Sequence, residues 1–236
     1  MNINFTWWIA LSNTILQTSD LVKIFGEGTP LEVHALRGVN LDIAQGEIVA
    51  IMGPSGCGKT TLLNMIGGLD KPSSGSVFID GNEITGYSDK DITDFRKKNL
   101  SFIFQFFNLF DVLTAVENVS LPLLLMGEST AAAQEKAKVI LREVGIGSRL
   151  YNRPNEMSGG QRQRVAIARS LITNPKIVLA DEPTGDLSSV ISKDIMKLFR
   201  RLNEDLGQTF VLVTHSELIG SLCDRIIKMK DGLIID

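Results

Sequence analysis

Apolar residues in this chain occur in two patterns, short unbroken runs and longer stretches in which they recur every three or four positions. Four short runs predict strands: EIVAIM (47–52), LSFIF (100–104), KIVLA (176–180) and TFVLVT (209–214). Helical patterns separate them, as in TTLLNMIGGL (60–69) and in residues 190–206. Strands that alternate with helices predict an α/β domain with a largely parallel sheet.

Other segments depart from this alternation. GSVFIDGNEI (75–84) predicts a hairpin that turns at Asp80-Gly81, and RIIKMKDGLIID (225–236) predicts a final hairpin. Between about 106 and 172 the pattern is mainly helical, in LTAVENVSLPLLLM, STAAAQEKAKVILREV and SGGQRQRVAIARSLI. We therefore expect a helical subdomain, about 106–172, inserted into the α/β core.

The turn after the first buried run predicts a phosphate site. GPSGCGKT (53–60) matches G-x-x-x-x-G-K-[ST] between a strand and a helix, the context that this motif requires. Glycines let the backbone approach phosphate oxygens, and the N–H groups at a helix start attract anions. Lys59 is expected on the β- and γ-phosphates and the Thr60 hydroxyl on Mg²⁺. The expected nucleotide-binding residues are Gly53, Pro54, Ser55, Gly56, Cys57, Gly58, Lys59, Thr60 and Thr61.

Two of these residues have simpler interpretations. Thr61 is alternatively only a residue at the start of the helix. Cys57 is interpreted as a tolerated small residue, at a position where its side chain is hardly needed.

Two adjacent acids follow the run at 176–180. A carboxylate at the end of a strand beside a phosphate loop is typical of an Mg²⁺ ligand, often through water, and this is the role expected for Asp181. Glu182 should point to the opposite side of the backbone from Asp181, toward the water that attacks the phosphate. As a base it can polarise this water.

A second anion site is predicted within the helical block. Ser158, Gly159, Gly160 and Gln161 open a helix, so its N–H groups and dipole can hold a phosphate. The chain already has its own phosphate loop, and a second site therefore favours pairing with another chain.

These motifs, and their order along the chain, resemble those of the nucleotide-binding subunits of ATP-binding-cassette (ABC) transporters. The resemblance covers about residues 15–236 and implies one ABC ATPase domain. Its parts would be a RecA-like P-loop NTPase core, the inserted helical subdomain and a small antiparallel β subdomain. It also implies that Gln105 reaches Mg²⁺ and the attacking water, that His215 contacts the γ-phosphate, and that Phe25 stacks on adenine. For Phe25, simple core packing is the alternative.

The family implies a mechanism and partners. Two subunits close head to tail over two ATP molecules, each held between one phosphate loop and the other subunit's residues 158–161. Hydrolysis, with Glu182 as base, reopens the pair and drives integral membrane permease subunits from the cytoplasmic face of the membrane. The motifs resemble most the branch that serves lipoprotein release and the export of macrolides and antimicrobial peptides.

Two features leave alternatives open. Phe106, Phe107, Leu109, Phe110 and Leu113 follow Gln105 and either pack within the helical block or form a groove for a permease helix. The loop after Glu182 reads Pro-Thr-Gly-Asp-Leu-Ser, so Ser188 stands where the family commonly has an aspartate that contacts the opposite subunit. This departure keeps a second function open, an ABC-type ATPase with a regulatory, mechanical or soluble assembly role.

Composition limits the partners and the compartment that we expect. The 236 residues carry a formal net charge of −3, which gives no reason to expect a nucleic-acid partner. Two lone cysteines, Cys57 and Cys223, fit a reducing compartment. Residues 1–14 are apolar, carry Trp7 and Trp8, and form either a frayed extension or a segment that rests on a membrane or a partner. His34 is expected in a turn without a role.

Overall fold

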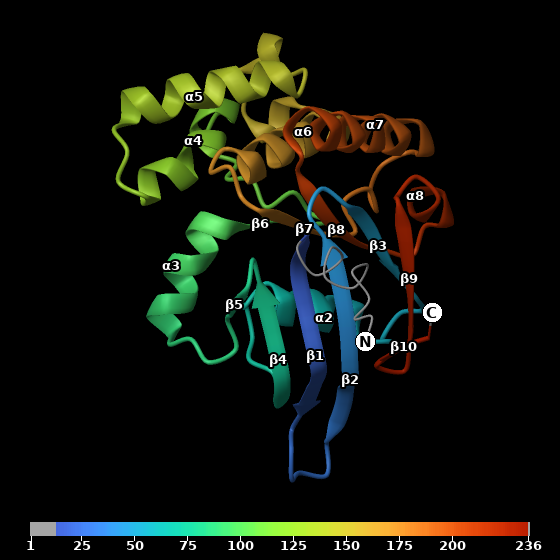
Figure 1. Cartoon of the computed structure of the whole chain (residues 1–236). Helices are drawn as coiled ribbons and strands as arrows, with labels where there is room; N and C mark the ends of the chain where they lie inside the picture. The colour runs from blue at the N-terminus through green and yellow to red at the C-terminus, as the bar shows by residue number, and fades with distance from the viewer. Residues whose placement is uncertain (1–12, 236) are drawn as a thin grey trace, which may run out of the picture.

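The computed structural model describes residues 13–235 and contains two sheets with helices packed around them (Figure 1). Most of the predicted extension, residues 1–12 of 1–14, lies outside the described residues, and Thr14 already belongs to the first strand. The larger sheet has six strands in the order β10-β9-β3-β8-β7-β6. Neighbours from β9 to β6 are parallel, and β10 pairs antiparallel with β9. The strands are β3 (Ile48–Met52), β6 (Leu100–Ile103), β7 (Ile177–Asp181), β8 (Thr209–Thr214), β9 (Arg225–Lys230) and β10 (Leu233–Ile234).

Burial on both faces explains the unbroken apolar runs of the central strands. All six residues of β8 and the first four of β3 and of β7 are buried. Parallel strands covered by helices or by a second sheet have no solvent face, so they show no alternation of polar and apolar residues. The four predicted central strands and both hairpins are confirmed.

The second sheet is antiparallel, in the order β2-β1-β4-β5. Its strands are β1 (Thr14–Phe25), β2 (Val33–Ala44), β4 (Ser74–Ile79) and β5 (Asn82–Glu83). Helix α2 (Lys59–Ile66) contributes Leu62 and Ile66 to one buried cluster that also holds Leu16 of β1 and Val211 of β8. The two sheets and α2 therefore share one hydrophobic core, and the phosphate loop, which leads into α2, lies next to it.

Helices also lie on the opposite side of the large sheet (Figure 1). Three of them contact its strands: α6 (Gly159–Leu171), α7 (Ser189–Leu206) and α8 (Glu217–Gly220). The helices α4 (Ala115–Leu125) and α5 (Thr130–Glu143) pack against α6, and 3₁₀ turns lie at Gly147–Arg149 and Pro154–Glu156. A second buried cluster joins these helices to the sheet, for example through Phe199 of α7 and Phe210 of β8, whose ring centroids lie 4.7 Å apart. The three helical stretches predicted between 106 and 172 are confirmed as α4, α5 and α6.

Two features differ from the sequence predictions or were absent from them. His34 lies in β2, paired with Ile24 of β1, so its placement in a turn was wrong. Helix α3 (Asp89–Asn99) was not predicted, because Ile92 is its only buried residue and an apolar stripe is missing. None of the helices among residues 13–235 combines the length and the hydropathy that a membrane span requires.

Candidate functional site

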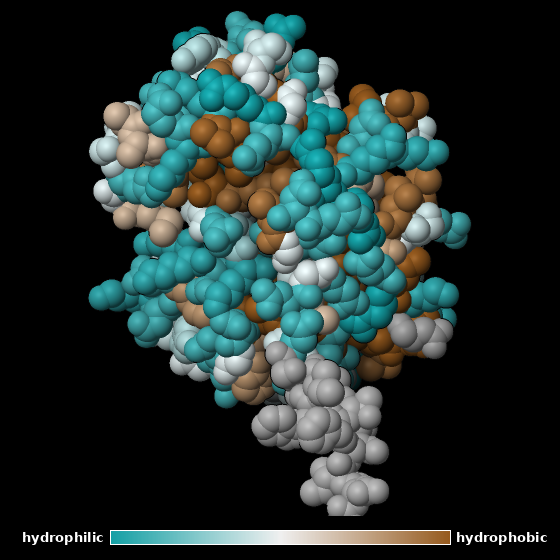
Figure 2. Space-filling model, turned by 45° about the horizontal axis from the view of Figure 1, so that its top comes forward, coloured by the Kyte–Doolittle hydropathy of each residue, from teal (hydrophilic) through white to brown (hydrophobic). Residues whose placement is uncertain are grey.

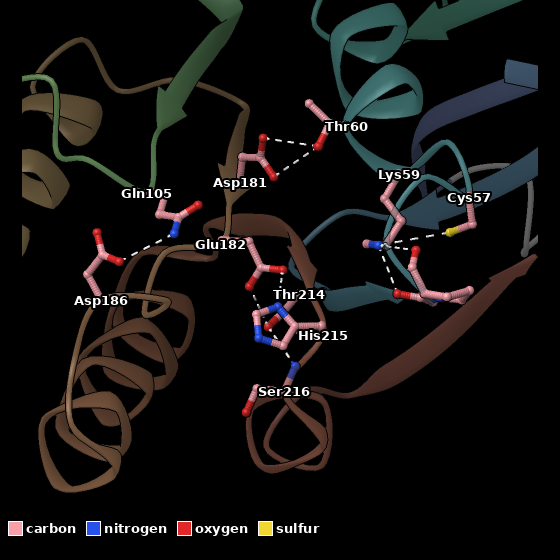
Figure 3. A network of polar contacts seen from close by, with 12 residues as sticks. Cys57, Lys59, Thr60, Gln105, Asp181, Glu182, Asp186, Thr214, His215 and Ser216 are labelled. Atoms are coloured by element: carbon pink, nitrogen blue, oxygen red, sulfur yellow. Dashed lines mark hydrogen bonds and ion pairs between the residues drawn. The ribbon is translucent and has the colours of Figure 1, made fainter. Parts of the chain in front are cut away.

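The phosphate loop connects β3 to α2 and lines a cavity of about 580 Å³. Lys59, the first residue of α2, is 9% exposed, and its ammonium group donates hydrogen bonds of 2.8 Å to the carbonyl oxygens of Gly53 and Pro54 (Figure 3). These two bonds hold the cation against the loop that a phosphate would occupy. A buried ammonium group with carbonyl partners is well suited to exchange them for phosphate oxygens.

Close packing requires glycine at both ends of the loop. A Cβ on Gly53 would lie 2.2 Å from the carbonyl oxygen of Met229 and 2.7 Å from Sγ of Cys57. Gly58 has φ of +103°, and a Cβ there would lie 2.4 Å from the carbonyl oxygen of Ala35. Both glycines are thus needed by the surrounding strands, before any contact with phosphate is considered.

Cys57 has a structural role that the sequence interpretation missed. Its side chain is 3% exposed in the core beneath the loop, and Sγ lies 3.9 Å from Nζ of Lys59. The interpretation that this side chain is hardly needed was therefore wrong.

Thr60 and Asp181 come together across the cavity. The Thr60 hydroxyl donates to the Asp181 carboxylate, with oxygen–oxygen distances of 3.2 and 3.4 Å. Burial raises the pKa of the Asp181 carboxyl, and the charge of Glu182 adds to this, while the Thr60 hydrogen bond and Lys59 oppose it. A bound cation would favour the ionised carboxylate, because opposite charge offsets the cost of burial.

Glu182 has different partners from those of its neighbour. It adopts a left-handed backbone conformation, with φ of +46°, directly after β7. Its carboxylate accepts a hydrogen bond of 3.1 Å from the buried Thr214 hydroxyl, and Nδ1 of His215 lies 2.7 Å from its other oxygen. The end of β8 therefore holds the carboxylate from two sides (Figure 3). The two adjacent acids serve separate networks, one with Thr60 and one with β8.

Gln105 lies beyond the end of β6 and lines the same cavity. Its amide nitrogen donates to Oδ1 of Asp186 at 3.4 Å.

The cavity brings most of the predicted site residues together. Phosphate-loop residues line one part of it, and the side chains at the ends of β6, β7 and β8 line another. Its lining includes these predicted residues: Phe25, Ser55, Gly56, Gly58, Lys59, Thr60, Thr61, Gln105, Asp181, Glu182 and His215. Phe25 is 43% exposed, with Nζ of Lys23 4.9 Å from its ring centroid, so core packing does not account for it. Gly53, Pro54 and Cys57 lie outside this lining.

Ser158, Gly159, Gly160 and Gln161 also lie outside the described lining of the cavity. They form the start of α6, where Ser158 caps the helix. Its side chain accepts from the backbone N–H of Gln161, and the Gln161 side chain accepts from the backbone N–H of Ser158. This reciprocal capping fixes the start of α6, where Ser158 is exposed and Gly160 is buried.

Comparison with known proteins decides the family. The family described as ABC transporter matches residues 36–185. The lipoprotein-releasing system ATP-binding protein LolD of Bacteroides thetaiotaomicron is 44% identical over 220 residues, which cover 93% of this chain and 99% of that protein. The chain belongs to the ABC transporter family.

Two other ABC proteins extend the comparison. The macrolide export ATP-binding/permease protein MacB of Aggregatibacter actinomycetemcomitans is 45% identical over 221 residues, covering 94% of this chain and 34% of that protein. A dimeric post-hydrolysis structure of the ATP-binding cassette MJ0796, bound to ADP and Pi, is similar with a TM-score of 0.85 and 43% identity. It matches over 94% of this chain and 97% of that chain.

The chain is thus an ABC transporter ATPase subunit, with the fold of an ABC cassette. Sequence reasoning missed some residues of the site. Val33, His34 and Ala35 of β2 line the nucleotide cavity, and Thr214 orients Glu182. Only the hairpin that brings β2 beside Phe25 reveals the first three. For Thr214, the one local signal was its position directly before His215.

Proposed function

We propose that this ABC subunit closes head to tail with a second copy over two ATP molecules and drives a separately encoded permease. One observation carries this proposal: residues 158–161 form a capped helix start outside the chain's own nucleotide cavity, with Ser158 exposed at the cap. A helix start is suited to a phosphate, and a second copy is the simplest source of one.

The residues of the cavity fit an ATP-bound Mg²⁺ ion. Thr60 and Asp181 already approach each other as a hydroxyl and a carboxylate, and Gln105 lines the same side. No group of three or more His, Cys, Asp or Glu side chains suited to a metal exists among the described residues, so phosphate oxygens and water would complete the coordination. When bound, the ion neutralises charge on the β- and γ-phosphates.

Glu182 supports hydrolysis as the base that orients and polarises the attacking water. Thr214 and His215 hold its carboxylate in place, and the imidazole is 73% exposed in the side chain, so it is free to meet a γ-phosphate that enters the cavity. Lys59 would leave the carbonyl oxygens of its loop for phosphate oxygens.

Exposed apolar side chains, most of them in the segment that follows Gln105, support docking of a permease. Phe106 is 72% exposed, Phe110 53% and Val112 76%, and Leu125 of α4 is 71% exposed. Phe107, by contrast, is buried, so packing within the helical block accounts for only part of the aromatic run. Figure 2 shows hydrophobic surface on this side of the molecule, in its upper half and along its right edge, among hydrophilic residues. Such exposed patches commonly mark protein partners.

Relatives support the cargo class and the location. LolD is named for lipoprotein release and MacB for macrolide export. We infer export or release of a lipophilic or peptide substrate, by a complex in which this chain sits peripherally on the cytoplasmic face of the membrane. The permease selects the substrate in such a system.

Affinity purification from detergent extracts tests the transport assignment. The chain should be recovered with an integral membrane permease, and Phe110→Asp should lose this partner while retaining ATP binding. Val139→Asp is the matched control, because Val139 is 52% exposed and lies on α5, outside the segment that follows Gln105. Recovery only as a soluble complex with assembly factors would favour the alternative, an ABC-type ATPase outside transport.

A further inference from the structure

The loop between β7 and α7 places one carboxylate against the Gln105 amide. After Glu182 the loop reads Pro-Thr-Gly-Asp-Leu-Ser, so Asp186 is its only acidic residue. Two tight turns fix it: Gly185 N–H donates to the Glu182 carbonyl at 3.0 Å, and Leu187 N–H donates to the Thr184 carbonyl at 3.1 Å. Asp186 is therefore held at a set position relative to the catalytic base.

Gly185 brings the loop backbone against the Gln105 side chain. A Cβ at this position would lie 3.2 Å from Nε2 and 3.4 Å from Cδ of Gln105. Glycine therefore leaves room for the amide beside the loop, where a larger residue would crowd it. Within that space Nε2 donates to Oδ1 of Asp186 at 3.4 Å.

This hydrogen bond selects one of the two orientations of the amide. An ionised carboxylate only accepts hydrogen bonds, so the NH₂ group must face Asp186 and the oxygen must face the opposite way. Figure 3 shows the Gln105 oxygen on the side where Asp181 lies. The oxygen, which is the atom able to ligate a hard cation, is thus presented toward the Thr60–Asp181 pair.

Ser188 takes no part in this contact. It is exposed at the N-cap of α7, where its side chain makes no capping hydrogen bond. The carboxylate of this loop therefore serves Gln105 of the same chain, two positions before the site where the family commonly has an aspartate directed at the opposite subunit.

We propose that Asp186 is a positioning residue for Gln105, which orients the amide oxygen toward the metal side of the nucleotide cavity. The contact joins the segment that leads into the exposed Phe106 and Phe110 to the loop that begins at Glu182. When a permease displaces that segment, the Gln105–Asp186 hydrogen bond would transmit the movement to the loop that begins at Glu182 in the same subunit. This inference rests on the proposed function, because it assigns the residue to ATP-dependent metal binding.

Three variants test the contact: Asp186→Ala, Asp186→Asn and the control Asp205→Ala, which removes an exposed carboxylate from the last turn of α7. The first readout is the Gln105 side-chain amide resonance in the nucleotide-free protein. It should shift in Asp186→Ala and stay in place in Asp205→Ala. An asparagine can also donate to the amide oxygen, so Asp186→Asn should give an intermediate spectrum with both orientations.

The second readout is the Mg²⁺ concentration that gives half-maximal ATP hydrolysis. In Asp186→Ala it should rise about 2- to 12-fold, the factor that corresponds to one net hydrogen bond, with metal-free ATP affinity unchanged. In a Gln105→Ala background, Asp186→Ala should have no further effect, since its only route to the metal is through the amide.

Each outcome decides one claim. An unshifted Gln105 resonance, or additive effects of the two substitutions, would overturn the positioning role. A wild-type protein without metal-dependent hydrolysis would instead overturn the proposed function, and the amide resonance would still report whether Asp186 holds Gln105.

Discussion

Glu182→Gln separates the chemistry of the base from its placement. The side chain has a relative exposure of 16% and two polar partners, Thr214 and His215. Glutamine has the same size and keeps an oxygen to accept from Thr214. Its NH₂ group can donate to Nδ1 of His215 when the ring proton is on the other nitrogen. The network therefore survives, and only the ability to accept a proton is lost.

The expected magnitude follows from this separation. Loss of a positioned general base typically lowers a rate about 10²- to 10⁴-fold. This corresponds to roughly 3–5 kcal/mol of transition-state stabilisation, at about 1.4 kcal/mol per decade. Folding stability should change by less than about 1 kcal/mol, because both hydrogen bonds have a replacement.

Single-turnover hydrolysis with radiolabelled ATP measures the rate, and equilibrium binding of ATP is followed in parallel. Glu204→Gln, an exposed position on α7, is the control and should behave as wild type. Glu182→Gln should bind ATP with wild-type affinity while turnover falls by at least two decades. Hydrolysis within a factor of about three of the wild-type rate would refute the assignment of Glu182 as base.

Three further predictions follow from the geometry of the cavity. Asp181→Asn should raise the Tm of the nucleotide-free protein at pH 7.5, since burial raises the pKa of this carboxyl in the folded state and its ionised form there costs stability. This gain in Tm should shrink as the pH falls toward 3.8, the ordinary pKa of the carboxyl, where Asp181 becomes protonated in both the folded and the unfolded chain. Thermal melts across a pH series measure the gain, and a gain that does not depend on pH would count against this reasoning. Gly58→Ala should lower the free energy of unfolding, measured in urea, by about 1–3 kcal/mol, because the new Cβ would lie 2.4 Å from the carbonyl oxygen of Ala35 at a strained φ. Gly56→Ala should lower it less, because the space around its Cβ is open. Phe25→Ala should raise KM for ATP about 2- to 12-fold, the range for one aromatic stacking contact, and equal weakening of tripolyphosphate binding would contradict a stacking role.

Burial explains which parts of the fold were predictable from the sequence. β3 and β8 are covered on both faces, so their apolar runs are unmistakable. β1 and β2 were harder to delimit, because register shifts such as the one between Thr18 and Leu21 interrupt a period of two. α3 buries only Ile92, so its sequence lacks the apolar stripe that reveals a helix.

The candidate site divides in the same way. Lys59 and Thr60 were predictable because the phosphate loop is one continuous motif, and Asp181 because a strand delivers it. Contacts between distant segments were not predictable. Apart from the position of Thr214 directly before His215, no local pattern encodes the approach of Thr214 to Glu182 or of Asp186 to Gln105. The departure at Ser188 was visible in the sequence, but the partner that Asp186 gains was visible only in the folded chain.

Light scattering of Glu182→Gln, with and without ATP and Mg²⁺, measures whether two copies of the chain pair over the nucleotide. ATP should double the mass of the particle from that of one 25.9 kDa chain. Ser158→Arg, at the exposed N-cap of α6, should prevent the doubling without weakening ATP binding to the monomer. A particle that stays monomeric at saturating ATP, or a dimer that Ser158→Arg leaves intact, would contradict a site shared between two copies.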